Sequence, residues 1–414
     1  LVHYSYFNEG DADIFGINTL SAFRVRSSDD SRAMVSAFSL LLNKWLPMPM
    51  FELEPTGYSQ CAPYAWARVR IEDIGEGRAK ASRRYRFTWA FDTETSDDDI
   101  FSNLRPSFQD DKKMKQFSLC NKVFNMLGFM STNTSHFSSF SEYIASLLGV
   151  DKNESYKYIG FYIYFVNYIR LIGASPEVTL HNADEDTIPV DLVLDIGNSR
   201  TCGVLFERGE FTKSMMLDIR NLSQPHLTSD RPFDMRFAFR KADFGNDIYL
   251  PGDFFTWKSF VRVGEEAQKL VYRSLEEEGL KARTTNYSSP KRYLWDEKKY
   301  DGKWEFLITE DDPSNVALAS NIFVPIMSDL FDASGNYIGN SSDENIEYTD
   351  GNTCYSRSSL MTFVLIEVFQ QAITFINSPK FREKHGDIDC KRVLKNVVLT
   401  CPTAMPIKEQ IKLR

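Results

Sequence analysis

The sequence has few residues of the kinds that form metal sites or catalytic triads, and they are scattered. Its 414 residues include six cysteines and five histidines, with no CxxC pair and no cysteine–histidine spacing typical of zinc. No Ser/His/Asp arrangement is recognisable either. These absences give no support to a zinc centre, a disulfide framework or a hydrolase triad. They are typical of a protein of the reducing cytosol.

Excess positive charge and long hydrophobic runs are also lacking. The net charge is −9 and the pI about 5.3, so the chain offers no basic surface for a nucleic acid or an anionic membrane. The most apolar run, residues 158–174, contains Asn167 and Arg170 and is shorter than the ~20 apolar residues of a spanning helix. We interpret it as a buried, aromatic-rich helix. We therefore expect neither a nucleic-acid partner nor a membrane.

Hydrophobic and aromatic residues are plentiful. They make up 43% and 14% of the chain, which predicts a folded protein with large aromatic interiors. The length allows two or three domains. The chain begins with Leu1 rather than methionine and ends at Arg414 just after an element starts, so we expect it to be a fragment of a longer protein.

The first part of the chain is predicted to be an α+β domain, residues 1–187. Alternating polar and apolar residues at 65–71 and 84–91 predict an antiparallel hairpin. Apolar residues at helical spacing predict helices at 32–46, 113–127, 140–148 and 156–172. The acidic segment 181–188, which precedes Pro189, predicts the domain boundary.

The second part, residues 188–414, is predicted to begin with a β-meander. Three strand-like runs follow one another with short connections between residues 190 and 219, which excludes a Rossmann unit, where a helix must follow the first strand. A long helix at 356–376 and a buried strand at 396–401 follow, and a new helix starts after Pro402. The predicted class of the whole chain is α/β.

The first connection of this meander has the chemistry of a phosphate-binding turn. Gly197 lacks the Cβ that would block a phosphate, and the hydroxyls of Ser199 and Thr201 and successive backbone N–H groups can point at phosphate oxygens. Asp195 at the strand end can hold Mg²⁺ through water. The alternative is an ordinary hairpin in which Asp195 caps a turn at Gly197-Asn198.

The run DIGNSRTCG resembles the first phosphate motif of the actin, sugar-kinase and DnaK-type chaperone superfamily. Segments 262–268, 290–294 and 396–410 resemble further DnaK-type segments in the same order. The resemblance implies the first, RNase H-like lobe of an actin-like ATPase, with a mixed sheet, and ATP and Mg²⁺ as cofactors. It implies that Lys291 reaches the terminal phosphate, that Asp195 holds the metal, and that the phosphate-binding residues are Asp195, Gly197, Asn198, Ser199, Arg200 and Thr201.

More narrowly, the chain resembles the bacterial SrfB-type virulence factor family. The segments VDLVLDIGNSRTCGVLFE, SSPKRYLWD, YSRSSLMTF and LTCPTAMPIKEQ carry this resemblance, and YAWARVRI and YRFTWAFDT extend it towards the N-terminus. Members of that family are much longer than this chain. The resemblance implies a virulence factor in the bacterial cytoplasm, with secretion to a host as an open alternative.

Several alternatives remain at this stage. Lys291 is either a phosphate ligand or a solvated surface lysine, and Arg200 either contacts phosphate or, as we favour, pairs with a local acid. The full-length protein is expected to be an ATP-dependent switch coupled to a protein partner. Alternatives are a non-hydrolysing interaction module or toxin component, and a small-molecule kinase. The groups of a second lobe are not recognisable before Arg414, so this chain alone is expected to bind ATP weakly.

Overall fold

The computed structural model describes residues 2–8, 24–26, 34–36, 41–58, 66–76, 83–92, 106–108, 112–120, 122, 125, 129, 162–163, 165–170, 173–181, 187–207, 213–240, 244, 257–276, 286–299, 330–338 and 355–414. The chain forms two compact units. One contains Leu1–Glu185 with Asp243–Thr256, and the other contains Asp186–Ala242 with Trp257–Arg414. The division at Glu185 lies inside the acidic segment 181–188. The sequence pattern did not predict that Asp243–Thr256 belongs to the first unit.

The first unit is built from small antiparallel sheets. The predicted hairpin is confirmed, because β7 (Ala67–Glu76) and β8 (Arg83–Phe91) pair antiparallel with Ala67 opposite Phe91. One sheet has the order β1-β8-β7-β4, with β1 at Val2–Asn8 and β4 at Trp45–Pro47. Another has the order β10-β9-β5-β6, formed by Val178–His181, Met114–Leu119, Met50–Glu54 and Gly57–Tyr58. A short ladder joins β2 (Arg24–Arg26) to β3 (Met34–Ser36).

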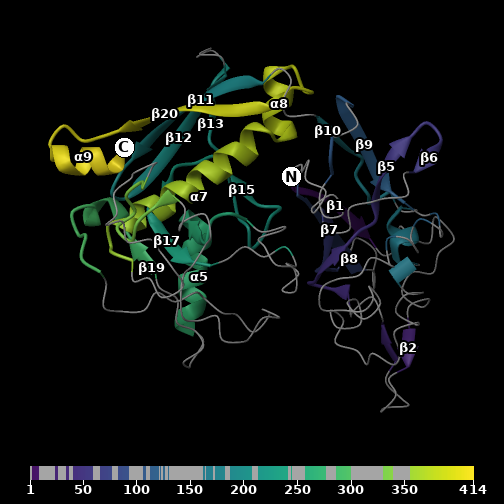
Figure 1. Ribbon diagram of the computed structural model, residues 1–414. Helices are drawn as coiled ribbons and strands as arrows, with labels where there is room; N and C mark the ends of the chain where they lie inside the picture. Colours follow the sequence, from purple (N-terminus) through teal and green to yellow (C-terminus); the bar gives the residue numbers. More distant parts are fainter. Residues whose placement is uncertain are drawn as a thin grey trace. The chain divides into compact units, whose positions relative to one another are not determined.

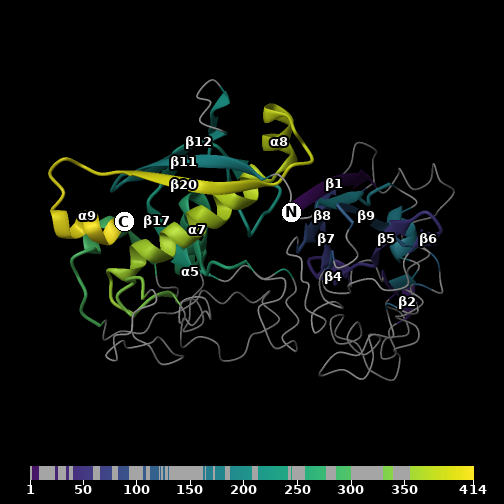
Figure 2. The same ribbon diagram turned by 45° about the horizontal axis from the view of Figure 1, so that its top comes forward.

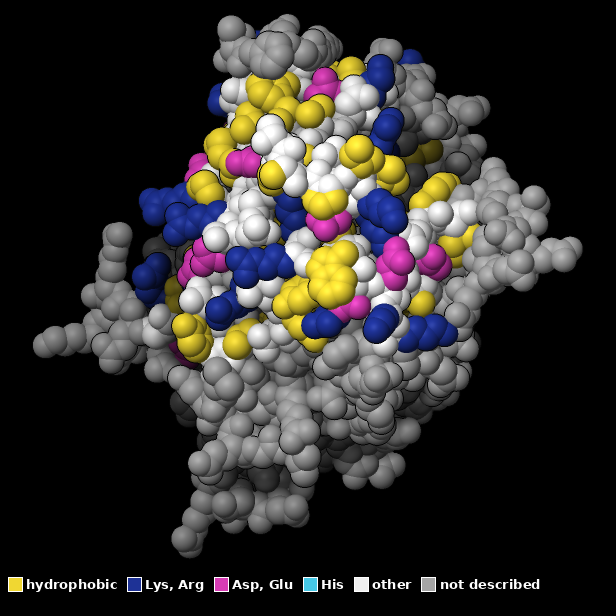
Figure 3. All heavy atoms as spheres, turned by 90° about the vertical axis from the view of Figure 1, so that its left-hand side faces the viewer, with side chains coloured by type: hydrophobic (Ala, Val, Ile, Leu, Met, Phe, Trp, Pro, Cys, Tyr) yellow, Lys and Arg dark blue, Asp and Glu magenta, His cyan; other side chains and the backbone are white. Residues whose placement is uncertain are grey.

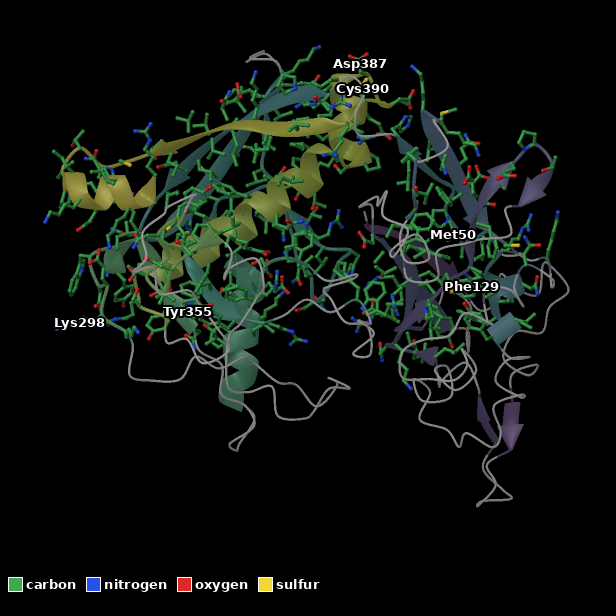
Figure 4. The ribbon with its side chains drawn as sticks, viewed as in Figure 1. Met50, Phe129, Lys298, Tyr355, Asp387 and Cys390 are labelled. Atoms are coloured by element: carbon green, nitrogen blue, oxygen red, sulfur yellow. The ribbon has the colours of Figure 1, made fainter. Side chains whose placement is uncertain are left out.

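Aromatic side chains form the interior of this unit, as the composition predicts. Trp66, beside β7, packs its ring 4.6 Å from that of Phe117 on β9, which joins two sheets. The Trp89 indole N–H donates to the Ala174 carbonyl at 2.9 Å. Figure 4 labels Met50 and Phe129 in this core. The Trp66 indole N–H likewise donates to the Met50 carbonyl at 3.3 Å, so these two buried indoles keep a hydrogen-bond partner while their rings fill the core.

Two of the predicted helices in this unit are wrong. Segment 32–46 contains β3 and the start of β4, and segment 113–127 contains β9. In β9, Phe117 and Leu119 are two residues apart and both buried, so the apolar spacing fits a strand as well as a helix. Pairing with β5 and β10 decides the outcome. Segment 140–148 lies outside the described residues, and helix is confirmed at 162–163 and 165–170.

The second unit contains a mixed sheet of order β13-β12-β11-β20. Strands β11 (Ile188–Ile196) and β12 (Arg200–Glu207) form an antiparallel hairpin, and β13 (Met215–Met216) pairs antiparallel with β12. The predicted meander is therefore confirmed. Strand β20 (Arg392–Thr400) lies parallel to β11 on the other side, at the edge of the described sheet, so the predicted strand at 396–401 is confirmed but its predicted burial is wrong, with Val398 52% exposed. The edge strand β16 (Phe233–Asp234) pairs with the start of β12.

One helix covers one face of this sheet. Helix α7 (Ser359–Ile376) crosses beneath β11 and β20 (Figures 1 and 2) and confirms the predicted long helix. Alternate residues of β11 face it, with Val190, Leu192 and Leu194 fully buried. Among the described helices, α7 is long and apolar enough to span a membrane, but 61% of that span is buried inside the unit. We read α7 as a core helix.

The remaining elements of this unit surround that layer. A sheet of order β18-β17-β19 packs with α5, and a two-stranded ladder, β14-β15, lies beside α7. Along the chain, α8 precedes β20 and α9 follows it. Their bounds are Val261–Val263 (β18), Arg236–Phe239 (β17), Asn286–Ser288 (β19), Gly264–Glu276 (α5), Ile219–Arg220 (β14), Thr228–Ser229 (β15), Pro379–His385 (α8) and Ile407–Leu413 (α9). The coarse expectation is confirmed: the described chain is a mixed α/β protein, rich in strands.

Candidate functional site

The turn between β11 and β12 is closed by its own backbone. The Gly197 N–H donates to the Arg200 carbonyl at 2.9 Å, directly beyond the last strand pair. An added Cβ on Gly197 would lie 2.5 Å from that carbonyl oxygen, although Gly197 has no positive φ. The turn itself therefore requires glycine. Asn198 and Ser199 are exposed, and neither of their backbone N–H groups bonds to another described residue.

Lys291 reaches the back of this turn from a distant segment. It lies in the 3₁₀ helix η6 (Pro290–Tyr293), only 7% exposed, and its Nζ donates to the Ile196 carbonyl at 2.7 Å. Ser289, the residue before this helix, has φ 56° and donates its hydroxyl to the Asn198 carbonyl at 2.6 Å. The interpretation of Lys291 as a solvated surface lysine is therefore wrong. Ser289 and Lys291, two residues apart, thus hold the turn from one side.

Asp195 lies at the end of β11, beside the end of β20. The parallel register places it opposite Thr400, whose hydroxyl donates to Asp195 Oδ1 at 2.5 Å. Both residues are exposed, on the sheet face away from α7. Asp195 Oδ2 makes no hydrogen bond to another described residue. The carboxylate thus keeps one oxygen available beside the turn.

Arg200 and Thr201 do not join this group. Arg200 places its Nε 3.3 Å from Asp234 Oδ1 on β16, which confirms the pairing with a local acid. Thr201 is 2% exposed on the inward face of β12, and its hydroxyl has no hydrogen-bond partner among the described residues. The structure therefore brings Asp195, Asn198, Ser199 and Lys291 together at one end of the sheet and turns Thr201 away from them.

Helix α5 supports this end of the unit through a buried acid. Gly264 starts the helix at φ 62° with Phe233 of β16 against it. Glu266 is 6% exposed and accepts hydrogen bonds from the backbone N–H groups of Leu222 and Ser223. Burial raises the pKa of Glu266 above its ordinary value of 4.5, opposed by the charge of Arg262 and by the hydrogen bonds from Ser223 and Leu222.

The raised pKa of Glu266 predicts a pH dependence of stability. The folded state binds this proton more tightly than the unfolded state, so the stabilisation is fully present below pH 4.5 and is lost as pH rises through the folded pKa. Glu266→Gln should remove this loss. Urea unfolding of both proteins at several pH values checks it. A stability difference between the two proteins that is constant with pH would contradict it.

Sequence reasoning missed two residues that complete the site. Ser289 precedes the Lys291 segment, and Thr400 stands two residues before Pro402 at the end of the predicted buried strand. Both lie inside segments that the sequence analysis had singled out, SSPKRYLWD and LTCPTAMPIKEQ. Neither carries a local signal, because their contacts depend on the register of strands far apart in the chain.

The surface around this end is mixed in charge. Figure 3 views the molecule from the side where β11 and β20 end, and basic, acidic and hydrophobic side chains are interspersed over its described part. No group of three or more His, Cys, Asp or Glu residues suited to a metal ion occurs within the described ranges. A cation here would depend on Asp195 and on water ligands rather than on a cage of side chains.

Comparison with known proteins gives one match. Residues 4–414 match the family model described as Virulence factor SrfB. No curated protein and no solved structure matches the chain. Because the match extends over nearly all of its length, this chain belongs to the SrfB virulence factor family.

Proposed function

We propose that the second unit is the first, phosphate-binding lobe of an actin/DnaK-like ATPase, and that the full-length protein is an ATP-dependent conformational switch. The observation that carries this proposal is the contact of Lys291 Nζ with the Ile196 carbonyl, 2.7 Å apart. It brings a lysine to the turn from 95 residues along the chain. In the proposed setting, a bacterial cytoplasm, the N-terminal unit couples the switch to a protein partner.

Strand order supports the assignment of the lobe. A three-stranded antiparallel meander is extended by a fourth strand, β20, parallel to β11, and α7 packs on one face. This is the arrangement expected of an RNase H-like lobe. Three of the four segments that resemble ATPase motifs, 195–203, 290–294 and 396–410, meet where β11 and β20 end. Their convergence is independent of the resemblance, because it depends on tertiary contacts.

The residues present fit the phosphate end of a nucleotide with its metal. The backbone N–H groups of Asn198 and Ser199 are available donors, and Lys291 supplies an ammonium group close by. Asp195 offers one carboxylate oxygen, which suits Mg²⁺ that keeps most of its water ligands. Bound Mg²⁺ would neutralise phosphate charge. No described residue is assigned to the adenosine end.

The test is MgATP binding to the full-length protein, with Lys291 replaced by methionine. Methionine keeps an unbranched apolar stem but removes the ammonium, so the affinity should fall about tenfold or more. Calorimetry measures the affinity, and circular dichroism verifies folding. Lys298→Met is the matched control, because Lys298 is exposed in the same unit (Figure 4). Equal affinity in both variants would remove Lys291 from the site.

Phosphate release from ATP separates a switch that hydrolyses from a binding module. In the full-length protein, Lys291→Ala and Asp195→Ala should each abolish release while the fold is retained. Unchanged turnover in both would contradict the assignment.

A second function has an observation in its favour. The Gly197 N–H donates to the Arg200 carbonyl, and the Lys291 ammonium donates to the Ile196 carbonyl. Both donors therefore already have a hydrogen-bond acceptor within the protein. Such a turn holds its shape without a ligand. This favours a non-hydrolysing interaction module or toxin component that keeps the fold. Absence of MgATP binding by a correctly folded full-length protein would support it over the switch.

A further inference from the structure

Two acidic residues of β11 on the sheet face away from α7 each have a polar partner on β20. Asn396 donates its side-chain amide to Asp191 Oδ1 at 2.7 Å, and Thr400 donates its hydroxyl to Asp195 Oδ1 at 2.5 Å. The pairs lie four residues apart on the same strands, with Val193 between the two acids. Only the second pair adjoins the turn. The first provides a built-in comparison.

We propose that Thr400 is a positioning residue, which holds the carboxylate of Asp195 in one orientation for a hydrated divalent cation carried by a nucleotide. The inference rests on the proposed function. One oxygen of Asp195 is held by Thr400, and the other has no hydrogen bond to a described residue. A cation that keeps most of its water ligands needs a single, correctly oriented acceptor of this kind.

Threonine suits this role through its shape. Its two substituents on Cβ restrict χ1, so the hydroxyl of a strand threonine stays in place at low entropic cost. The hydrogen bond to a carboxylate is charge-assisted, and 2.5 Å is at the short end of such bonds. The pair is nevertheless exposed. Loss of the Thr400 hydroxyl should therefore change the stability of the fold little. It should instead change the affinity for the ligand.

The parallel register is what makes the contact available. Asp195 and Thr400 are 205 residues apart in sequence and become direct neighbours because β11 and β20 end together. The hydroxyl approaches from the neighbouring strand, whereas Lys291 and Ser289 contact carbonyl groups of the turn. The Asp195 carboxylate and the backbone of the turn are thus held by separate contacts.

The experiment compares nucleotide binding by the full-length protein with and without metal. ATP affinity is measured by calorimetry in Mg²⁺ and again in EDTA, for the unsubstituted protein and for Thr400→Val, Thr400→Ser and Asn396→Leu. Valine matches the shape of threonine without the hydroxyl. We expect Thr400→Val to weaken binding in Mg²⁺ about fivefold to tenfold and to leave binding in EDTA unchanged. Thr400→Ser should stay within about twofold, and Asn396→Leu should match the unsubstituted protein in both conditions.

Each other outcome overturns the inference in a distinguishable way. Equal weakening of Thr400→Val in Mg²⁺ and in EDTA would assign Thr400 a merely structural role. Unchanged binding in both would show that Asp195 needs no positioning, while the proposed function survives. Absence of binding by the folded, unsubstituted protein would overturn the proposed function and this inference together. Thr400→Ala provides the same comparison if valine unfolds the protein.

Discussion

Replacing Glu367 with alanine is expected to lower the free energy of unfolding of the C-terminal unit by about 3–5 kcal/mol. Glu367 is on α7 and 1% exposed, and it forms a 2.9 Å ion pair with the equally buried Arg262 of β18. It also accepts hydrogen bonds from the Trp257 indole at 2.7 Å and the Gln371 amide at 2.9 Å. The alanine variant would leave a buried guanidinium without its carboxylate and two donors without their acceptor.

The expected loss of stability in Glu367→Ala comes from the burial of the unpaired Arg262 charge rather than from the attraction between Arg262 and Glu367. Removing one member of a buried pair leaves a charge in a poorly solvated place, whereas replacing both members with apolar residues of similar volume costs much less. We therefore expect Arg262→Met combined with Glu367→Leu to be more stable than Glu367→Ala alone. The Trp257 indole would still lose its acceptor, so some destabilisation should remain.

Urea unfolding followed by circular dichroism measures the Glu367 effect. The control is Glu265→Ala on α5. It removes an exposed ion pair in which Glu265 Oε1 lies 2.8 Å from Nζ of Lys269, four residues later in the helix. Exposed helix pairs contribute a few tenths of a kcal/mol, so this variant should unfold almost like the unsubstituted protein. A loss below about 1 kcal/mol for Glu367→Ala would show that water or neighbouring groups compensate the charge of Arg262.

Gly197→Ala is expected to destabilise the C-terminal unit by about 2 kcal/mol and, under the proposed function, to prevent MgATP binding by the full-length protein. The new Cβ would meet the Arg200 carbonyl oxygen at 2.5 Å, and this atom belongs to the backbone. It also accepts the Gly197 N–H, so relief of the clash must break the bond that closes the turn. Opening the turn would displace the N–H groups of Asn198 and Ser199 together.

Ser199→Ala is the matched control for the predicted loss of stability. Ser199 is exposed in the same turn, and its side chain bonds to no other described residue. Its replacement should change the stability by less than about 0.5 kcal/mol. Unfolding curves are measured for both variants, and calorimetry compares MgATP binding by Gly197→Ala with that of the unsubstituted protein. Normal binding by a stable Gly197→Ala protein would show that the turn tolerates a side chain and would weaken its assignment to phosphate.

Local patterns predicted the elements whose apolar residues recur with one clear period. The hairpin predicted from alternating polar and apolar residues was confirmed as β7 and β8, and the long helix predicted at 356–376 was confirmed as α7. The pattern was misleading at 32–46 and 113–127. In short segments, apolar residues at positions such as 114, 117 and 119 fit both helical and strand spacing, and only pairing with β5 and β10 resolves the choice.

The candidate site was predictable in part. The Gly turn follows from the local sequence, and Lys291 was singled out by resemblance to ATPase segments. The sequence predicted that the Thr201 hydroxyl contacts phosphate. Side chains of β12 alternate between the two faces of the sheet, and Thr201 lies on the inward face. Arg200 contacts Asp234 because β16 pairs with the first residues of β12. No local sequence pattern predicts this contact.

The amino-acid sequence alone determined the membership of the SrfB family, the meander with its glycine turn, and the apolar face that α7 buries. These depend on residue identity and on periodicity over a few turns or strand pairs. Only the tertiary structure decided that Lys291 contacts the carbonyl of Ile196 and that Thr400 holds Asp195. The physical reason is register: the parallel pairing of β11 and β20 joins residues 205 positions apart, and no local interaction specifies that distance.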